Sequence, residues 1–391
     1  MSDWYEAKIK DFADVKGGKR LPKGKQLVKE PNNHPYIRIR DLGKSKYLQL
    51  TSEYEYVDDE TQQSISRYIV NKGDILISVV GTIGLIGIVG ATLDGANQTE
   101  NCDKIINITG VMPEYLYYYL KSNLGQDEIR KGTVGAVQPK LPLKNVQDIS
   151  VFYPPMEEQE RIVAILSAID EKIETNEAVN NNLEQQAQAI YSNMVPYSVD
   201  DALPTEWYKG TVEDIIEIHD SKRIPLSGQA RQKMEKKTYP YYGAASLMDY
   251  VDNYIFDGKY LLLGEDGTVV DAAGFPILQY VWGKFWVNNH AHILTGKRGF
   301  NVESLMLLFR KTPVKSIVTG AVQPKISQAN LKSIPIVIPS KSVLYELNSV
   351  IEPLFAQIRL NIDENKSLAA LRDALLPKLM SGEIDVSDIT I

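Results

Sequence analysis

The stretch GAVQPK occupies residues 135–140 and occurs a second time, unchanged, at residues 320–325. The correspondence continues downstream of both copies without a gap. Each half also opens alike, with KRLP at residues 19–22 and KRIP at residues 222–225. Because six identical consecutive residues rarely recur by chance, we interpret the chain as a tandem duplication.

Each half begins with a strand-rich part. Short runs of β-branched and aromatic residues are separated there by Gly, Asp and Asn, a pattern typical of strands joined by turns. A short helix is expected just before each GAVQPK. The predicted strands lie within residues 36–42, 68–80, 259–271 and 285–295, and the predicted short helices at 113–122 and 302–310.

A helical period follows each strand-rich part. Apolar residues recur at alternating spacings of four and three, from Ile162 onward and again from Leu347 onward. This seam predicts two long helices that pair as a coiled coil. A helix of about 38 residues would be about 57 Å long.

Two asparagines lie in the middle of each seam, Asn176 and Asn180 in the first and Asn361 and Asn365 in the second. In an antiparallel pair, Asn176 would face the neighbourhood of Asn365, and Asn180 that of Asn361. A buried polar layer of this kind costs stability and fixes the register of the helices. The alternative is an exposed helix face.

The segment PPMEEQERI at residues 154–162 resembles the PPxxEQxxI signature of the specificity subunits of type I restriction-modification systems. The order of parts resembles that family as well, because its members alternate two target recognition domains with two long helices. The second half departs from the signature, since PSKSVLYEL at residues 339–347 lacks the second proline and the EQ pair. This departure favours a helix-start role for Pro155 and Glu157.

The resemblance implies an α+β fold. Two strand-rich α/β target recognition domains in tandem repeat would be separated by two long helices, which form an antiparallel coiled coil with pseudo-two-fold symmetry. The expected boundaries are 1–155 for the first recognition domain, 156–195 for the first helix, 196–340 for the second recognition domain and 341–391 for the second helix.

The resemblance also implies a function and partners. The chain would be a non-catalytic subunit that reads a bipartite target in double-stranded DNA. It would bind two methyltransferase subunits and, through them, restriction subunits. S-adenosylmethionine, ATP and Mg²⁺ would then belong to the partners, and this chain would carry no cofactor.

The net charge of −7 does not exclude a DNA partner. Residues 156–200 and 341–391 carry net charges of −7 and −3, so the rest of the chain is slightly basic. The apolar stretch 75–92 contains several glycines and suits buried strands better than a membrane span. A single cysteine, Cys102, and an N-terminus without an apolar segment indicate a reduced, cytoplasmic protein.

The sequence offers little support for catalysis. It contains no GxxxxGK[ST] phosphate loop, and Tyr-Pro-Pro at residues 153–155 is not an adenine methyltransferase motif. Asp220, Glu235 and Lys237 match only a permissive nuclease pattern. His290 and His292 lack a third metal ligand, so no metal site is predicted. A stand-alone DNA-modifying enzyme or nuclease with fused recognition domains is the alternative, and an interaction scaffold is a third.

Candidate DNA contacts fall into two groups. Residues shared by the halves suit framework or phosphate contacts, because two recognition domains normally read different bases. Residues that differ between the halves suit base reading, where basic groups alternate with aromatic ones. The shared group is Lys19, Arg20, Gln138, Lys140, Lys222, Arg223, Gln323 and Lys325, and the divergent group is Tyr36, Arg38, Arg40, Lys44, Lys236, Lys237, Tyr241 and Tyr242.

Overall fold

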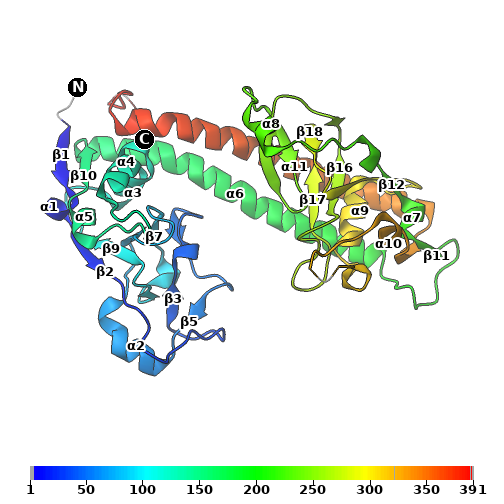
Figure 1. Cartoon of the computed structure of the whole chain (residues 1–391), viewed down its shortest axis with the longest axis horizontal. Coiled ribbons are helices and arrows are strands. Elements are labelled where there is room, and N and C mark those ends of the chain that lie inside the picture. The colour runs from blue at the N-terminus through cyan, green and yellow to red at the C-terminus, as the bar shows by residue number, and fades with distance from the viewer. Residues whose placement is uncertain (1–3, 321, 388, 390–391) are drawn as a thin grey trace. The chain divides into compact units, whose positions relative to one another are not determined.

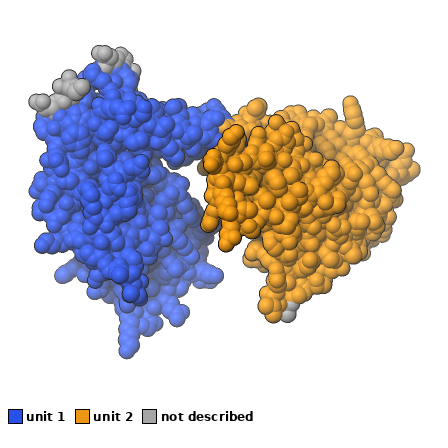
Figure 2. Space-filling model, turned by 45° about the horizontal axis from the view of Figure 1, so that its top comes forward, with its two compact units in different colours: residues 1–175, 364–391 blue, residues 176–363 orange. Residues whose placement is uncertain are grey.

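The computed structural model describes residues 4–320, 322–387 and 389. The chain forms two compact units, coloured separately in Figure 2: unit 1 comprises residues 1–175 and 364–391, and unit 2 comprises residues 176–363. Each long helix contributes one half to each unit. A compact unit therefore combines one strand-rich part with segments of both helices, whereas the boundaries expected from the sequence follow the change from strands to helix.

The described strands of unit 1 form three sheets, whose strands can be followed in Figure 1. A five-stranded sheet has the order β2-β9-β6-β7-β4, a three-stranded sheet has the order β5-β3-β8, and β1 pairs with β10. The strands are β1 (Tyr5–Lys8), β2 (Asp14–Gly17), β3 (Pro35–Ile37), β4 (Tyr47–Leu48), β5 (Glu55–Tyr56), β6 (Ile75–Ser78), β7 (Ile86–Val89), β8 (Asn97–Gln98), β9 (Cys102–Ile106) and β10 (Ser150–Tyr153). The short helices are α1 (Ile9–Phe12), α2 (Asp59–Ile65), α3 (Pro113–Lys121), α4 (Asn123–Gly132) and α5 (Leu143–Gln147), with 3₁₀ turns η1 (Ile39–Asp41), η2 (Ser66–Tyr68) and η3 (Ala91–Leu93).

Unit 2 shares most of this topology, but its first sheet has four strands instead of five and its second has four instead of three. Its sheets have the orders β12-β19-β16-β17 and β14-β13-β18-β15, and β11 pairs with β20. The strands are β11 (Tyr208–Thr211), β12 (Ile216–Ile218), β13 (Tyr239–Tyr242), β14 (Leu247–Val251), β15 (Phe256–Asp257), β16 (Tyr260–Gly264), β17 (Leu278–Val281), β18 (Lys284–Val287), β19 (Ala291–Gly296) and β20 (Pro335–Ile338). The short helices are α7 (Val212–Ile215), α8 (Gly228–Gln232), α9 (Val302–Phe309) and α10 (Gln328–Lys332), with 3₁₀ turns η4 (Asp220–Lys222) and η5 (Lys315–Ile317).

The predicted helices are confirmed. The helices expected before each GAVQPK are α3 and α9, and the long ones are α6 (Met156–Met194) and α11 (Lys341–Met380). In unit 1, Ile162 and Leu166 of α6 pack in one core with Leu379 near the end of α11. In unit 2, Tyr191 near the end of α6 packs with Leu347 of α11. The beginning of each helix thus lies beside the end of the other, so the two helices pair antiparallel.

The predicted runs are strand only in part: the run 68–80 contains only β6, and the run 285–295 is divided between β18 and β19. The run 36–42 was expected to be extended, but only its first residues belong to β3, and Ile39–Asp41 form the turn η1. The Arg38 amide donates to the Asp41 carboxylate at 2.7 Å, which closes this turn. An aspartate that accepts from a nearby backbone amide competes with strand pairing, and here that local bond prevails.

The two ends of the described chain meet in unit 1. Gly382 lies against the indole of Trp4, at a distance where a Cβ would be 3.2 Å from the ring. Leu379, Met380 and Val386 pack with Ile9 in the same core. Among the described residues, no helix combines the length and the apolar character that crossing a bilayer requires.

Candidate DNA interface

The repeated GAVQPK loops close in the same way in both units. Val134 and Lys140 exchange two backbone hydrogen bonds, 2.8 and 2.9 Å long, and Thr319 and Lys325 do the same at 2.9 and 2.8 Å. Gly135 has a φ of +95°, and a Cβ there would lie 2.8 Å from a carbonyl oxygen across the loop. The turn therefore requires glycine.

The side chains of both loops point into solvent, with Ala321 outside the described residues. Val137 is 94% exposed and Val322 is 99% exposed. Side chains this exposed form no part of either core, so the expected framework role is confined to the loop backbone. Phosphate contact stays a prediction for the polar side chains, all of them exposed: Gln138, Lys140, Gln323 and Lys325.

The two Lys-Arg pairs have different environments. Lys19 and Lys222 are both exposed. The Arg20 side chain is 80% exposed, and its Nε lies 2.6 Å from the Glu100 carboxylate. The Arg223 side chain is only 14% exposed. Its Nε donates to the Asp220 carbonyl at 3.1 Å and its Nη1 donates to the Ala291 carbonyl at 2.9 Å.

The expected DNA contact is therefore corrected for Arg223. This guanidinium also pairs with the carboxylates of Asp220 and Glu265. Two carboxylates with little exposure need a cation beside them, because an unpaired buried charge is costly. Arg223 supplies that cation and connects η4 to the Glu265 carboxylate and to the start of β19.

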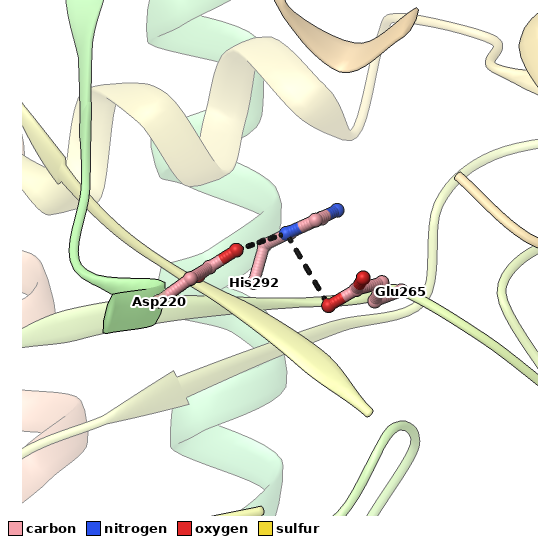
Figure 3. A group of neighbouring side chains, drawn as sticks. All are labelled: Asp220, Glu265 and His292. Carbon is pink, nitrogen blue, oxygen red and sulfur yellow. Dashed lines mark hydrogen bonds and ion pairs between the residues drawn. The ribbon is translucent and has the colours of Figure 1, made fainter. Parts of the chain in front are cut away.

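Asp220, Glu265 and His292 point toward one another in unit 2 (Figure 3), and one ligand atom from each lies within 4.8 Å of the others. The Nδ1 atom of His292 lies 2.6 Å from the Asp220 carboxylate and 3.7 Å from the Glu265 carboxylate. Its Nε2 atom lies 2.8 Å from the Ile326 carbonyl oxygen. Burial opposes the charge on Asp220, but the bond from His292 and the Ile293 amide hold the pKa of this carboxyl below its usual value.

This group forms an ion-pair network. Both ring nitrogens of His292 face oxygen atoms of the protein, the Asp220 carboxylate and the Ile326 carbonyl. The absence of a metal site stays a prediction, and the sequence did not reveal that Asp220 and Glu265 lie beside His292 as further potential ligands. The negative charge of Glu265 is also balanced by Arg223 and by Lys325, whose Nζ lies 3.3 Å from the Glu265 carboxylate. The second histidine of the predicted pair, His290, precedes β19 and pairs with Asp266 instead.

The permissive nuclease pattern does not form one cluster. The amides of Glu235 and Lys237 bond to the Asp252 carboxylate at 3.2 and 2.8 Å. Asp220 instead bonds to His292 and to the Ile293 amide. These separate sets of contacts give the pattern no shared site.

A hollow in unit 1 brings together several of the predicted base readers. It is lined by Arg38, Arg40 and Lys44, with Thr82 and Asn101. The Arg38 side chain is 41% exposed and that of Arg40 is 50% exposed. The basic groups therefore lie at an open, concave surface. Sequence reasoning missed the hydroxyl and amide groups on the rim, because they carry no charge and lie far from the arginines in sequence.

Tyr36 and Tyr241 are buried, so the expected direct contact of either ring with DNA is corrected. The Tyr36 hydroxyl donates to the Lys19 carbonyl at 3.0 Å, and burial raises the pKa of Tyr36 to about 12. The Tyr241 hydroxyl accepts from the Leu226 amide at 3.1 Å. Each ring packs in the interior of its unit, where a large aromatic side chain buries much apolar area.

The predicted basic residues of unit 2 lie on a loop held by acids. Lys237 has a φ of +43°, and its amide and that of Lys236 both donate to the Asp252 carboxylate at 2.8 Å. These backbone bonds hold the pKa of Asp252 below its usual value. Lys236 and Lys237 are exposed, and Tyr242 is half-buried with its edge toward Phe285.

The asparagines of the helix seam meet as predicted in unit 2. Asn361 donates from Nδ2 to Oδ1 of Asn180 at 2.8 Å, and both side chains are buried. In unit 1, Asn365 donates to the Ile173 carbonyl at 3.3 Å. Asn176 is also buried. The exposed-face alternative is therefore excluded for Asn176, Asn180 and Asn361.

Gln159 has a structural role that the sequence did not reveal. Its side chain is fully buried, and its Oε1 accepts from the Met112 amide at 2.8 Å. Its Nε2 donates to the carbonyls of Pro154 and Gly110 at 2.9 and 3.3 Å. The glutamine of the PPxxEQ segment thus ties the start of α6 to the loop before α3. At the matching position of unit 2 stands the buried, apolar Leu344.

Comparison with known proteins places these features in a family. The family model described as "Type I restriction modification DNA specificity domain" matches residues 1–185 and 204–369, one match for each half. The chain is 26% identical over 417 residues to the type I restriction enzyme MjaIX specificity subunit of Methanocaldococcus jannaschii, covering 99% of this chain and 95% of that protein. It is 29% identical over 203 residues to the HindI specificity subunit of Haemophilus influenzae, covering 49% of this chain and 41% of that protein.

A solved structure has the same fold. It is the crystal structure of the S subunit of a type I restriction-modification system from M. genitalium, with a TM-score of 0.57 and 17% sequence identity. The match covers 97% of this chain and 96% of that chain. The fold therefore agrees across nearly the whole length despite low identity.

Proposed function

The chain belongs to the family of type I restriction-modification DNA specificity domains, and from this premise we propose that it reads a bipartite DNA target, one half-site with each unit. As the specificity subunit of such a system, it is itself neither the methyltransferase nor the nuclease. The observation that supports recognition of two half-sites is that both units present the same two kinds of surface. Each unit presents an identical, exposed GAVQPK loop beside a surface that differs from its counterpart.

The shared and divergent surfaces suit different contacts. A duplex has the same backbone at both half-sites, so Gln138 and Lys140 in unit 1, with Gln323 and Lys325 in unit 2, are proposed to contact phosphates. Base edges differ between half-sites, so the divergent residues are proposed to read them. Lys19 and Arg20 are exposed on unit 1 and are proposed as additional phosphate contacts.

The paired helices are proposed to set the distance between the half-sites. α6 has 39 residues and α11 has 40, which corresponds to a rod of about 60 Å at 1.5 Å per residue. The hydrogen bond between Asn180 and Asn361 would hold the register of this rod. The same helices are proposed to bind two methyltransferase subunits, which would bring S-adenosylmethionine, while the restriction subunits would bring ATP and Mg²⁺.

The proposal is tested by reconstituting the chain with its methyltransferase subunits and mapping the methylated adenines in host DNA. The expected result is one target with two defined parts and a fixed gap. Inserting four residues between Ile190 and Met194 of α6, with a matching four-residue insertion in α11, lengthens the helix pair by about 6 Å and turns each helix by close to one full turn. The half-sites should then keep their bases and move apart by about two base pairs.

Two outcomes would contradict the proposal. An unchanged gap in the insertion variant would show that the helices do not set the spacing. Methylation or cleavage of DNA by the chain alone would favour the stand-alone enzyme. Lys140→Gln gives a further measurement, because loss of one phosphate contact should weaken binding equally on all sequences and lower the salt slope by about one. Lys8→Gln, a lysine on β1 beside Asp148, is the matched control.

A further inference from the structure

The surfaces of the two units that are proposed to read bases can be compared position by position. β3 pairs parallel with β8 in unit 1, as β13 pairs parallel with β18 in unit 2. Tyr36 and Tyr241 are the matching buried rings. Across the adjacent antiparallel pair, Tyr36 faces Glu55 and Tyr241 faces Asp249. These four residues fix the structural alignment of the two surfaces.

The chain between these fixed points differs in length. Eighteen residues lie between Tyr36 and Glu55, but only seven lie between Tyr241 and Asp249. In unit 2 the connection is a tight hairpin closed by a bond of 2.9 Å from the Gly243 amide to a carbonyl oxygen. In unit 1 it is a long loop that carries basic residues to the edge of the hollow. The two units therefore present different chemistry at equivalent places.

Unit 1 presents guanidinium groups there. Glu55 accepts from Arg40 at 2.9 Å and also pairs with Arg38, so one carboxylate orients both side chains. Both remain about half exposed at the hollow, and each has further N–H groups beyond those bonds. A planar guanidinium fork matches the O6 and N7 acceptors of guanine in the major groove, which makes this the commonest specific contact of arginine.

Unit 2 presents apolar groups instead. Leu247 is 42% exposed and Met248 is 53% exposed at the end of the hairpin. Leu247 is the cross-strand neighbour of Tyr242, and the loop that carries Lys236 and Lys237 is tied to the far end of the same strand pair through Asp252. Cations flanking an apolar edge suit a polyanion with an apolar feature on it, and the C5 methyl of thymine is that feature in the major groove.

We propose that the two units read half-sites of different base chemistry. Unit 1 reads guanine through Arg38 and Arg40, and unit 2 reads thymine through Leu247 and Met248. The inference rests on the proposed function, because it assumes that each unit reads one half-site. It adds which bases each surface selects and names Leu247 and Met248 as specificity-determining residues.

The test is selection from a randomised duplex library by the complete complex of this chain with its methyltransferase subunits. Four chains are compared: the natural chain, Arg38→Gln with Arg40→Gln, Leu247→Ala with Met248→Ala, and the control Lys8→Gln. The natural chain and the control should select the same two-part target. The arginine variant should lose preference for guanine in one half only, by about tenfold to a hundredfold at that position.

The apolar variant should lose preference for thymine in the other half only. Replacing that thymine by uracil, which lacks the methyl group, should weaken binding of the natural chain but not of the apolar variant. Arg38→Lys keeps the charge and loses the fork, so it should also lose guanine preference. Circular dichroism of each variant verifies that it is folded.

The possible failures are distinguishable. If no two-part target is selected by any chain, the proposed function fails. If a two-part target is selected but the arginine variant changes a position other than guanine, or uracil binds as well as thymine, the proposed function stands and this inference is overturned. Equal weakening on all sequences by the apolar variant would also overturn it, because that result would make Leu247 and Met248 backbone contacts.

Discussion

The hydrogen bond between Asn180 and Asn361 should couple the two helices in a measurable way. Asn361 donates to Asn180 at 2.8 Å in a buried seam, and its own Oδ1 accepts from Gln357 at 2.7 Å. Changing Asn361→Leu leaves the Asn180 acceptor buried without this donor, at a cost of about 1–3 kcal/mol. Changing Asn180→Leu leaves the Asn361 donor in the same position. Each single variant should therefore lower the free energy of unfolding.

The double variant should recover stability. With both asparagines replaced, neither a donor nor an acceptor of this pair is left unpaired in the buried seam, so the cost of each single substitution is removed. We expect the double variant to unfold at no lower urea concentration than the natural chain, with a coupling energy of about 1–3 kcal/mol. Urea unfolding followed by circular dichroism measures it, with Asn181→Leu, an exposed neighbour, as the control. Strictly additive effects of the two substitutions would refute the reasoning.

Three further predictions concern individual polar side chains. Burial raises the pKa of Asp103 to about 6, so the free energy of unfolding should fall as the pH rises from about 4 to about 6. Asp103→Asn should remove this pH dependence and raise the free energy of unfolding by up to about 3 kcal/mol at pH 7, and parallel pH profiles of the variant and the natural chain would contradict it. Gln159→Ala should cost about 2–4 kcal/mol, measured by urea unfolding, because it leaves buried backbone groups without partners, whereas an unchanged midpoint would show that water replaces the amide. Arg223→Gln should cost about 3–5 kcal/mol in unfolding, whereas Arg20→Gln should leave stability unchanged and reduce the salt slope of DNA binding by about one; equal behaviour of the two variants would contradict their different burial.

The long helices were predictable because their signal is local. The spacing of four and three repeats many times along one segment, so α6 begins at Met156, as expected, and ends at Met194. The meeting of Asn180 and Asn361 followed from antiparallel pairing of two seams whose polar positions lie at their middles. Short strands gave a weaker signal. The expected strand ends after Ile37, where a bond of 2.7 Å from Arg38 to Asp41 closes the turn η1.

The candidate site was harder to predict, because its contacts join residues far apart in sequence. Both Lys-Arg pairs look alike in sequence, yet Arg20 is exposed and Arg223 is enclosed by Asp220 and Glu265. Which of them meets buried acids depends on strands that lie many residues away. Gln159 was missed for the same reason, since its partners lie before α3. The PPxxEQ segment was a signal for it, but the segment did not reveal that the amide is buried.

The division of the helices between the units has a consequence for synthesis. Unit 2 is one continuous segment, residues 176–363, whereas unit 1 is assembled from residues 1–175 and 364–391. On the ribosome, the first part made is therefore the last to be completed. Ile162 and Leu166 pack with residues of the first segment and also with Leu379 of the second, so this core is complete only after Leu379 has been translated. A chain released before that point would therefore carry an incomplete unit 1 core, and incomplete cores favour aggregation.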